Sequence, residues 1–370
     1  MNIYQHRSRL SRTKKALQEY KLTVGFIGGS ITDPSPGWNW PEGVCSWLQE
    51  RFPAVRLVVE NAGLGATGSD LAVFRAERDL INRGCDLVFI EFAVNDNGAP
   101  VEQRARTREG LVRKLLKGEG RDLVFVYTYM QTMYAEMMAG QVPASIAEFE
   151  NLAEHYQVGS VWMGMHALEE VKLGRMRWEE WLPDGLHPQY SGSASYAQSV
   201  KIYLEKSLSR REGINDENTD RIIPAPLNER NWENAVIMPF DQVYLEGPWT
   251  IRRWARSAWI DQVLHTSAVG ARLSFDFEGR GLLLGFDFGR SSAEFRYRLD
   301  ESGWLDSARD RPDWCGESGW YRTFLVGDDL PDGRHTFELE VVHGDPSGQM
   351  ILANKFTGTT IDLALIGIIP

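Results

Sequence analysis

The segment that most constrains the fold is residues 22–32, Leu-Thr-Val-Gly-Phe-Ile-Gly-Gly-Ser-Ile-Thr. Its first part is a continuous apolar run, which is typical of a strand buried on both faces of a sheet. Gly28 and Gly29 then favour a tight turn, because glycine tolerates positive φ and close backbone approach. The sequence therefore predicts a buried strand with Ser30 just past its carboxyl end, either as a nucleophile or as an ordinary helix cap.

Similar apolar runs recur through the first half of the chain, and helical patterns separate them. Further strands are expected at residues 55–60, 86–92, 123–127 and 159–162. Helices are expected at residues 5–20, 41–52, 70–83, 101–117, 145–156 and 166–173, with a last helix from Ser191 or Ser193 to 209. This alternation predicts an α/β domain whose parallel sheet is covered on both faces.

The second half of the chain has a different pattern. Short alternating runs at residues 271–277, 281–286, 293–299 and 335–342 are separated by Gly, Asp and Pro turns. This pattern predicts an all-β, jelly-roll-like antiparallel sandwich. The 370 residues fit two domains. We therefore predict an α/β domain at 1–210, a charged linker at 211–229 and a β-sandwich at 230–370.

Charge and cysteine content exclude several classes of protein. The net charge is −11, with acids and bases interspersed, which argues against nucleic acid or anionic membranes as partners. Neither a signal-peptide pattern nor a long apolar run is found, so no secretion signal or membrane span is expected. Cys45, Cys85 and Cys315 form no CxxC pair, so we expect reduced thiols in a cytoplasmic protein, without disulfides or a zinc site.

Three predicted loops of the first domain each follow a strand directly. Ser30 follows the first strand, the glycine-rich residues 63–68 follow the second, and Asn95 follows the third. The carboxyl ends of parallel strands share one edge of a sheet, so these loops should converge. The backbone amides of Ser30 and of a glycine such as Gly65, with the Asn95 side chain, are donors of the type that stabilises an oxyanion.

A serine nucleophile also needs a base, and His187 is the best candidate in the first domain. It stands three residues after Asp184, within a turn that lets the carboxylate orient the imidazole ring. Asp-Gly and His-Pro are also ordinary turn dipeptides, so a purely structural role stays open. With Ser30, these two residues would supply a catalytic triad. Surface or structural roles are expected for the other three histidines of this domain, His6, His155 and His166.

These residues together resemble the SGNH (GDSL) hydrolase superfamily. Residues 28–32, the loop after Asn61, residues 93–96 and residues 184–187 look like blocks one, two, three and five of that family. They come in the family's order within about residues 20 to 205. Each block is short, but the ordered set is specific. The resemblance implies a flavodoxin-like three-layer α/β/α sandwich with five parallel strands.

The resemblance also implies a role for each matched residue. Ser30 is the nucleophile, His187 the base and Asp184 the acid that orients it. The oxyanion hole consists of the Ser30 amide, the Gly65 amide and the side chain of Asn95. No cofactor and no metal are expected.

The chain departs from the family pattern at two positions. Gly29 stands where the family has its eponymous Asp, and Ala93 stands where block three usually begins with Gly. In block two, the Gly-x-Thr pattern selects Gly65, although Gly63 and Ala66 are close enough to donate instead.

Other chemistries fit the sequence less well. The glycines after the first strand do not match the Gly-x-Gly-x-x-Gly pattern of dinucleotide-binding folds. A glycosidase would need two carboxylates, for which Glu91, Asp96 and Asp184 are candidates, but Glu91 falls within a strand. No HExxH pattern is present.

Aromatic residues point toward a carbohydrate substrate. Trp38 and Trp40 follow the candidate nucleophile, where they either contact the substrate or pack the loop. The second domain is rich in aromatic residues, like many carbohydrate-binding modules, but aromatic residues in strands more often form the core. The sandwich could instead cover the catalytic cleft or form an oligomer interface. The sequence thus predicts a serine esterase that removes short acyl groups, above all acetyl, from a carbohydrate, with a small-molecule or oligosaccharide ester as its substrate.

Several alternatives stay open at this point. Within the same fold, the chain could be a lipase, thioesterase or lysophospholipase acting on longer acyl chains, or an acyltransferase. From another class, it could be a non-catalytic carbohydrate-binding protein on a hydrolase fold. Whether the chain forms a homo-oligomer is also open.

Overall fold

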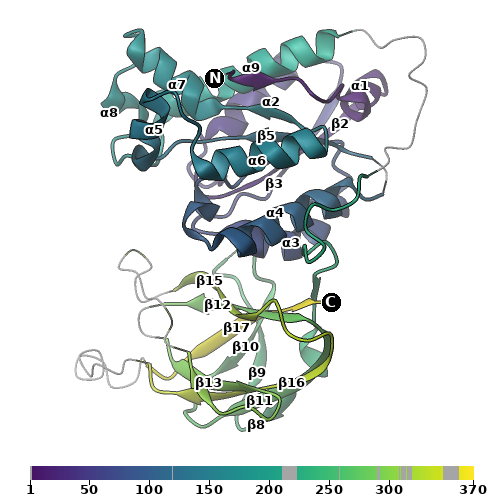
Figure 1. The fold of residues 1–370 in the computed structure, drawn as a ribbon, viewed down its shortest axis with the longest axis vertical. Coiled ribbons are helices and arrows are strands. Elements are labelled where there is room, and N and C mark those ends of the chain that lie inside the picture. The colour runs from purple at the N-terminus through teal and green to yellow at the C-terminus, as the bar shows by residue number, and fades with distance from the viewer. Residues whose placement is uncertain are drawn as a thin grey trace. The chain divides into compact units, whose positions relative to one another are not determined.

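The computed structural model describes residues 2–118, 120–210, 223–257, 259–289, 292–307, 309, 314, 319–344 and 358–370. The chain divides into two compact units, Met1–Glu233 and Asn234–Pro370 (Figure 1). Most of the predicted linker, residues 211–222, and Cys315 lie outside the described residues. The predicted domain boundaries stay predictions.

The first unit is built on one sheet. Its strands, in spatial order, are β1 (Tyr4–Gln5), β6 (Gly159–Val161), β5 (Asp122–Val126), β4 (Leu87–Glu91), β2 (Lys21–Gly28) and β3 (Arg56–Asn61). All neighbours pair in parallel except β1, which is antiparallel to β6. The five parallel strands follow the flavodoxin-like order, in which the direction of strand addition across the sheet reverses between β2 and β4. Ligands bind at such a switch point, beyond the carboxyl ends of the strands.

Helices cover both faces of this sheet (Figure 1). The helices α2 (Trp40–Arg51), α7 (Met163–Lys172) and α9 (Tyr190–Ser209) pack together, while α3 (Ser69–Ala76), α4 (Val101–Leu116) and α6 (Ala144–His155) form a second group. The other helical segments are α1 (Ser11–Gln18), η1 (Glu77–Ile81), η2 (Asn95–Gly98), η3 (Gln131–Met133), α5 (Tyr134–Met138) and α8 (Trp178–Trp181). The predicted α/β architecture is confirmed.

Three local expectations differ from the structure. The predicted helix at 5–20 begins only at Ser11, because Tyr4 and Gln5 pair as a strand with Val161 and Ser160. The segments η3 and α5 lie in what the sequence indicated was a loop after β5. The helix after the glycine-rich loop changes to π geometry at Glu77. Local sequence carries no signal for the strand, because it depends on a partner more than 150 residues away.

The second unit contains two antiparallel sheets, as predicted. One has the order β15 (Trp320–Gly327), β12 (Gly281–Phe288), β17 (Ile361–Ile369), β10 (Gln262–Thr266) and β9 (Thr250–Arg253), and β7 (Val236–Ile237) also pairs with β17. The other has the order β14 (Leu305–Asp306), β13 (Glu294–Leu299), β16 (Gly333–Val342), β11 (Arg272–Gly279) and β8 (Tyr244–Glu246), and a 3-10 turn, η4 (Phe240–Gln242), precedes β8. A shared apolar core that includes Phe275, Phe286 and Phe337 joins them.

Residues 223–233, the last part of the first unit, pack against α4. The Glu109 carboxylate of α4 accepts hydrogen bonds from the amides of Leu227 (2.6 Å) and Asn228 (2.7 Å). Trp232 is fully buried, and its amide donates to the Arg106 carbonyl. Gly110 of α4 makes this approach possible, because a Cβ there would lie 2.6 Å from the Trp232 nitrogen. Among the described residues, no helix is long and apolar enough to cross a membrane.

This contact predicts that Gly110→Ala destabilises the first unit. In an open helix the change would stabilise by up to about 1 kcal/mol. Here the new methyl meets the Trp232 backbone, so we expect a net loss of about 1 to 3 kcal/mol. Urea unfolding measures it, with Gly98→Ala as the control because a Cβ at Gly98 meets nothing within 4 Å. If Gly110→Ala were as stable as wild type or more stable, the Trp232 segment would have to move away from α4 at little cost.

Candidate functional site

Ser30, His187 and Asp184 form one chain of hydrogen bonds at the carboxyl edge of the sheet. Ser30 Oγ lies 2.9 Å from His187 Nε2, and His187 Nδ1 lies 2.7 Å from Asp184 Oδ2. Since the carboxylate accepts the Nδ1 proton, the neutral ring presents Nε2 to the serine as an acceptor. The structure thus brings together the three residues that the sequence singled out.

The turn after β2 holds Ser30. The amides of Thr32 and Asp33 both donate to the Gly29 carbonyl at 3.0 Å, which closes the turn. The side-chain amide of Asn39 donates to the Ser30 carbonyl (3.1 Å) and to the Asp33 carbonyl (2.7 Å). Because the turn is bonded on both sides of Ser30, its hydroxyl has a defined position.

Hydrogen bonds from its own backbone close the turn that carries Asp184 and His187. Asp184 Oδ1 accepts hydrogen bonds from the amides of Leu186 (2.9 Å) and His187 (2.7 Å). Partial burial alone would raise the pKa of Asp184, but these two amides and the His187 ring together lower it below its ordinary value. Gly185 adopts a φ of 79°, the left-handed region that this tight turn requires. Asp184 therefore stays a carboxylate that orients His187.

Asn95 lies directly beside the serine turn. It begins η2 just after β4, and its side-chain amide packs against Gly29 so closely that a Cβ at Gly29 would collide with it. Gly29, which stands where the family pattern has Asp, therefore leaves room for the Asn95 side chain. The structure brings Asn95 to Ser30, as the sequence predicted.

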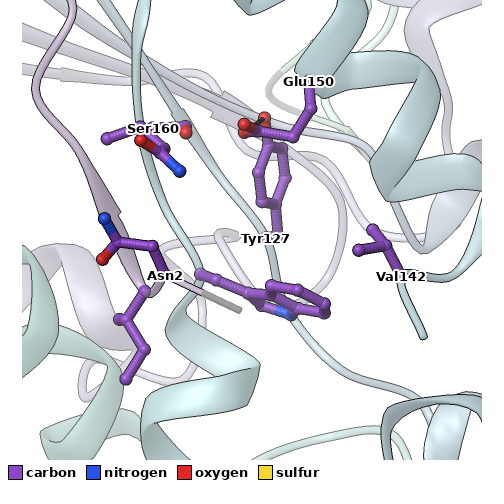
Figure 2. A pocket seen from close by; sticks show the side chains of 8 residues that line it. Asn2, Tyr127, Val142, Glu150 and Ser160 are labelled. Carbon is purple, nitrogen blue, oxygen red and sulfur yellow. Dashed lines mark hydrogen bonds between the residues drawn. The ribbon is translucent and has the colours of Figure 1, made fainter. Parts of the chain in front are cut away.

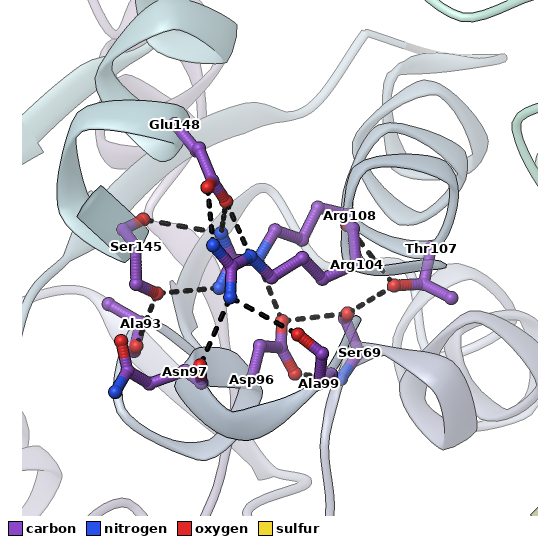
Figure 3. Close-up of polar contacts among 10 residues, drawn as sticks. All are labelled: Ser69, Ala93, Asp96, Asn97, Ala99, Arg104, Thr107, Arg108, Ser145 and Glu148. Carbon is purple, nitrogen blue, oxygen red and sulfur yellow. Dashed lines mark hydrogen bonds and ion pairs between the residues drawn. The ribbon is translucent and has the colours of Figure 1, made fainter. Parts of the chain in front are cut away.

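A buried polar network anchors the Asn95 loop (Figure 3). Asp96 accepts hydrogen bonds from the Ser69 amide (2.9 Å) and hydroxyl (2.8 Å) and from Arg108 Nε (2.8 Å). Arg108 also donates to Ser145 Oγ at 2.7 Å, and Ser145 Oγ donates to the Ala93 carbonyl at 2.5 Å. The loop is therefore held on both sides of Asn95.

Two arginines of this network were missed by sequence reasoning. Arg108 is 1% exposed and also donates to Glu148 (2.9 Å). Arg104 donates to Glu148 and to the carbonyls of Asn97 and Ala99. The available signal was their i, i+4 spacing on α4, but the same spacing is common on solvated helix faces.

The glycine-rich loop differs in detail from expectation. The Gly65 amide, the predicted oxyanion donor, donates to Asp33 Oδ2 at 3.2 Å. The Gly63 amide donates to Asn61 Oδ1 at 2.9 Å. Ala66 is exposed and has a φ of 55°. In this structure the Gly65 amide is therefore engaged within the protein, since Asp33 follows the serine turn closely.

The two tryptophans after Ser30 have different environments. Trp40 is 1% exposed, packs against Phe26 and Phe89 and donates to Thr32 Oγ1 at 3.1 Å. The suggested substrate contact of Trp40 is therefore wrong, because its ring lies in the core. Trp38 is 45% exposed, and its contact with substrate stays a prediction.

The other three histidines of the first unit and the two described cysteines have structural environments. His6 stacks on Tyr203, and burial lowers its pKa to about 4, with help from Arg210 and Lys206. His155 bonds to the Ala225 carbonyl, and His166 contacts the Tyr4 hydroxyl. Cys45 and Cys85 are free and buried, and burial raises the pKa of each to about 12. Among the described residues, no cluster of three or more His, Cys, Asp or Glu side chains could hold a metal ion.

Glu91 is fully buried beneath the serine turn. Its carboxylate accepts hydrogen bonds from the Gly29 amide (3.3 Å), Thr32 Oγ1 (3.2 Å) and Thr128 Oγ1 (2.9 Å). Burial raises the pKa of Glu91 to about 7, although these hydrogen bonds oppose the shift. Glu91 and Asp96 are both buried, so neither is placed like the paired carboxylates of a glycosidase.

A separate pocket of about 230 Å³ lies at the β1–β6 end of the sheet (Figure 2). It is lined by Asn2, Ile3, Gln5, Tyr127, Val142, Glu150, Ser160 and Trp162. The Glu150 carboxylate is already paired with Arg7 (2.6 Å) and the Tyr127 hydroxyl (2.7 Å). Since no residue of the Ser30–His187–Asp184 chain lines it, this pocket is not part of the candidate site.

The raised pKa of Glu91 predicts a pH-dependent contribution to stability. The folded state binds the Glu91 proton more tightly than the unfolded state, whose pKa is near 4.5. The stabilising contribution of the protonated group is therefore complete below pH 4.5 and is lost as pH rises through about 7, in total on the order of 3 kcal/mol.

Urea unfolding of wild type and Glu91→Gln at pH 5 and pH 8.5 tests this. Wild type should lose about 2 to 3 kcal/mol relative to the variant between the two pH values. A constant difference between them would show that Glu91 titrates alike in the folded and unfolded states.

No family model and no curated protein matches the sequence. Two similar solved structures are of a two-domain esterase (CEX) active on acetylated mannans. In one, co-crystallised with mannopentaose, the TM-score is 0.79 at 24% identity, covering 97% of this chain and 94% of that one. In the other, the TM-score is 0.81 at 23% identity, covering 97% and 95%.

A third structure is a catalytic mutant of Axe2, an acetylxylan esterase from Geobacillus stearothermophilus, with a TM-score of 0.43 at 19% identity over 51% of this chain and 95% of that one. The two matches, each over at least 94% of both chains, show that this chain has the same two-domain fold, a parallel-sheet α/β unit followed by a unit of antiparallel sheets.

Proposed function

We propose that the protein is a serine esterase that removes acetyl or other short acyl groups from a carbohydrate. The observation that carries this proposal is the hydrogen-bonded chain from Ser30 through His187 to Asp184. It lies at the switch point of the sheet, where flavodoxin-like folds bind their ligands.

The geometry supports the following sequence of steps. Ser30 Oγ attacks the ester carbonyl carbon while His187 Nε2 takes the hydroxyl proton, and the Asp184 carboxylate stabilises the imidazolium. The bond from the carbonyl carbon to the alcohol oxygen breaks, and His187 returns the proton to the leaving sugar. Water, deprotonated by His187, then attacks the acyl-enzyme and releases the carboxylic acid with Ser30 restored.

Oxyanion stabilisation is assigned to the Ser30 amide and the side-chain amide of Asn95, which lies against the serine turn. We assign the third donor to the Ala66 amide in place of Gly65. Gly63 and Gly65 already donate within the protein, whereas Ala66 lies at the exposed tip of the same loop.

The substrate class rests on two supports. The two full-length structural neighbours act on acetylated mannans, and one was crystallised with mannopentaose. In this chain, both His187 (47% exposed) and Asp184 (54% exposed) are open to solvent, which suits an ester carried on a bulky saccharide. A cytoplasmic location, proposed from the sequence, would make a short imported oligosaccharide the natural substrate.

Ser30→Ala should lower kcat on p-nitrophenyl acetate on the order of 10⁴-fold or more, because the reaction then lacks its nucleophile. Hydrolysis of p-nitrophenyl esters from acetate to octanoate measures both the loss and the acyl preference. Ser46→Ala, on the exposed surface of α2, is the matched control and should keep wild-type activity.

Activity confined to short esters and lost only in Ser30→Ala supports the proposal. A preference for octanoate would instead favour a lipase that acts on longer acyl chains. Undiminished activity of Ser30→Ala would contradict the serine mechanism.

Asn95→Ala should lower kcat by about 100- to 1000-fold, the usual effect of removing one oxyanion donor. The fold should be unchanged, because Asp96 and Arg108, not Asn95, carry the network that holds this loop. Steady-state kinetics and circular dichroism check both expectations, with the exposed Asn82→Ala as control. A near wild-type kcat would remove Asn95 from the oxyanion hole.

A further inference from the structure

Glu91 is the last residue of β4, and its side chain is not used in the mechanism above. It is 0% exposed, and each of its two carboxylate oxygens accepts hydrogen bonds from a different loop at the site. Burying a carboxylate is unfavourable unless its hydrogen-bond partners are well placed. The position of Glu91 therefore suggests that its hydrogen bonds have a specific function.

One oxygen of Glu91 holds the serine turn. Oε2 accepts the Gly29 amide at 3.3 Å and Thr32 Oγ1 at 3.2 Å, so it contacts the turn on both sides of Ser30. The backbones of Gly28 and Glu91 are also closely packed, since a Cβ at Gly28 would lie 2.8 Å from the Glu91 carbonyl oxygen. The Gly29 amide could therefore reach another acceptor only if the turn moved.

The other oxygen holds the segment that supports the histidine loop. Oε1 accepts Thr128 Oγ1 at 2.9 Å, and Thr128 is fully buried just after β5. Three residues further on, the Gln131 amide donates to the Gly185 carbonyl at 2.9 Å. Gly185 lies between Asp184 and His187, so the segment from Thr128 to Gln131 connects Glu91 to the base.

We propose that Glu91 is a positioning residue that sets the Ser30–His187 geometry by holding the nucleophile turn and the base-supporting segment from one carboxyl group. This inference rests on the proposed function. Glu91 makes no contact with the reacting atoms in this role. Its contribution is to hold the 2.9 Å contact between Ser30 Oγ and His187 Nε2. Displacements of about 1 Å in such contacts lower rates by about 100-fold.

The role requires hydrogen-bond acceptance toward Gly29 and does not require a negative charge. A glutamine at position 91 can present its carbonyl oxygen to Gly29 and Thr32 and donate its amide to the Thr128 hydroxyl, which can also accept. A leucine of similar size leaves the Gly29 amide without its acceptor in a dry environment. The two substitutions therefore separate a positioning role from mere packing.

The test compares kcat and KM of Glu91→Leu and Glu91→Gln on p-nitrophenyl acetate. We expect Glu91→Leu to lower kcat on the order of 100-fold with KM within about twofold, and Glu91→Gln to stay within about threefold of wild type. Thr128→Val, which removes only the contact on the base side, should lower kcat about 10-fold. It keeps the test decisive if the leucine variant does not fold.

Glu109 offers a matched control. It is 1% exposed and likewise accepts three hydrogen bonds, from the Tyr156 hydroxyl (2.5 Å) and the amides of Leu227 and Asn228. These partners lie away from the serine turn, so Glu109→Leu should lower stability and leave kcat unchanged when measured well below its unfolding temperature.

The inference is overturned if Glu91→Leu and Thr128→Val keep kcat within about threefold of wild type, if Glu91→Gln loses as much as Glu91→Leu, or if Glu109→Leu loses kcat equally. Ser30→Ala, measured alongside, separates the two proposals. If Ser30→Ala keeps full activity, the esterase mechanism itself fails. If Ser30→Ala is inactive while the Glu91 and Thr128 variants are fully active, only the positioning role fails.

Discussion

The parallel pairing of β2 with β3 on one side and β4 on the other is the constraint on which the site depends. Parallel strands end at a common edge, so the loops after these strands have to meet there. Ser30, the glycine-rich loop and Asn95 belong to those loops, and the pairing brings together residues that are up to 65 positions apart in the chain. Because β2 is buried on both faces, a shift of its register would disrupt side-chain packing on both faces of the sheet.

Close packing at this edge explains how the chain departs from the family pattern. Gly29 has no side chain where the resemblance expects Asp, and the Asn95 amide occupies the space that a side chain would need. Ala93 replaces the usual glycine, and its carbonyl is fixed by Ser145, which is in turn held by Arg108. Buried charged and hydroxyl groups from α4 and α6 thus hold the Asn95 loop in place. The residues of the family pattern do not include these groups.

Sequence reasoning predicted the elements whose cause is local and failed where the cause is distant. The buried strands, the serine turn and the Asp184–His187 turn have local signatures, and the structure contains all of them. Trp38 and Trp40 look alike in sequence, and only packing against Phe26 places Trp40 in the core. The engagement of the Gly65 amide by Asp33 and the role of Arg108 likewise depend on contacts between separate loops, for which a single sequence carries no signal.

Asp184 and His187 share one four-residue loop, whereas Ser30 lies in the turn that directly follows β2 of the sheet. The Asp184–His187 pair is held by its own backbone amides, so any displacement of this loop carries both side chains together. Thermal fluctuation would therefore vary the Ser30–His187 separation while leaving the hydrogen bond between His187 Nδ1 and Asp184 intact. In the proposed mechanism, loosening of this loop lowers the rate gradually, because Ser30 and His187 are in contact for a smaller fraction of the time, while the tautomer of His187 stays the same.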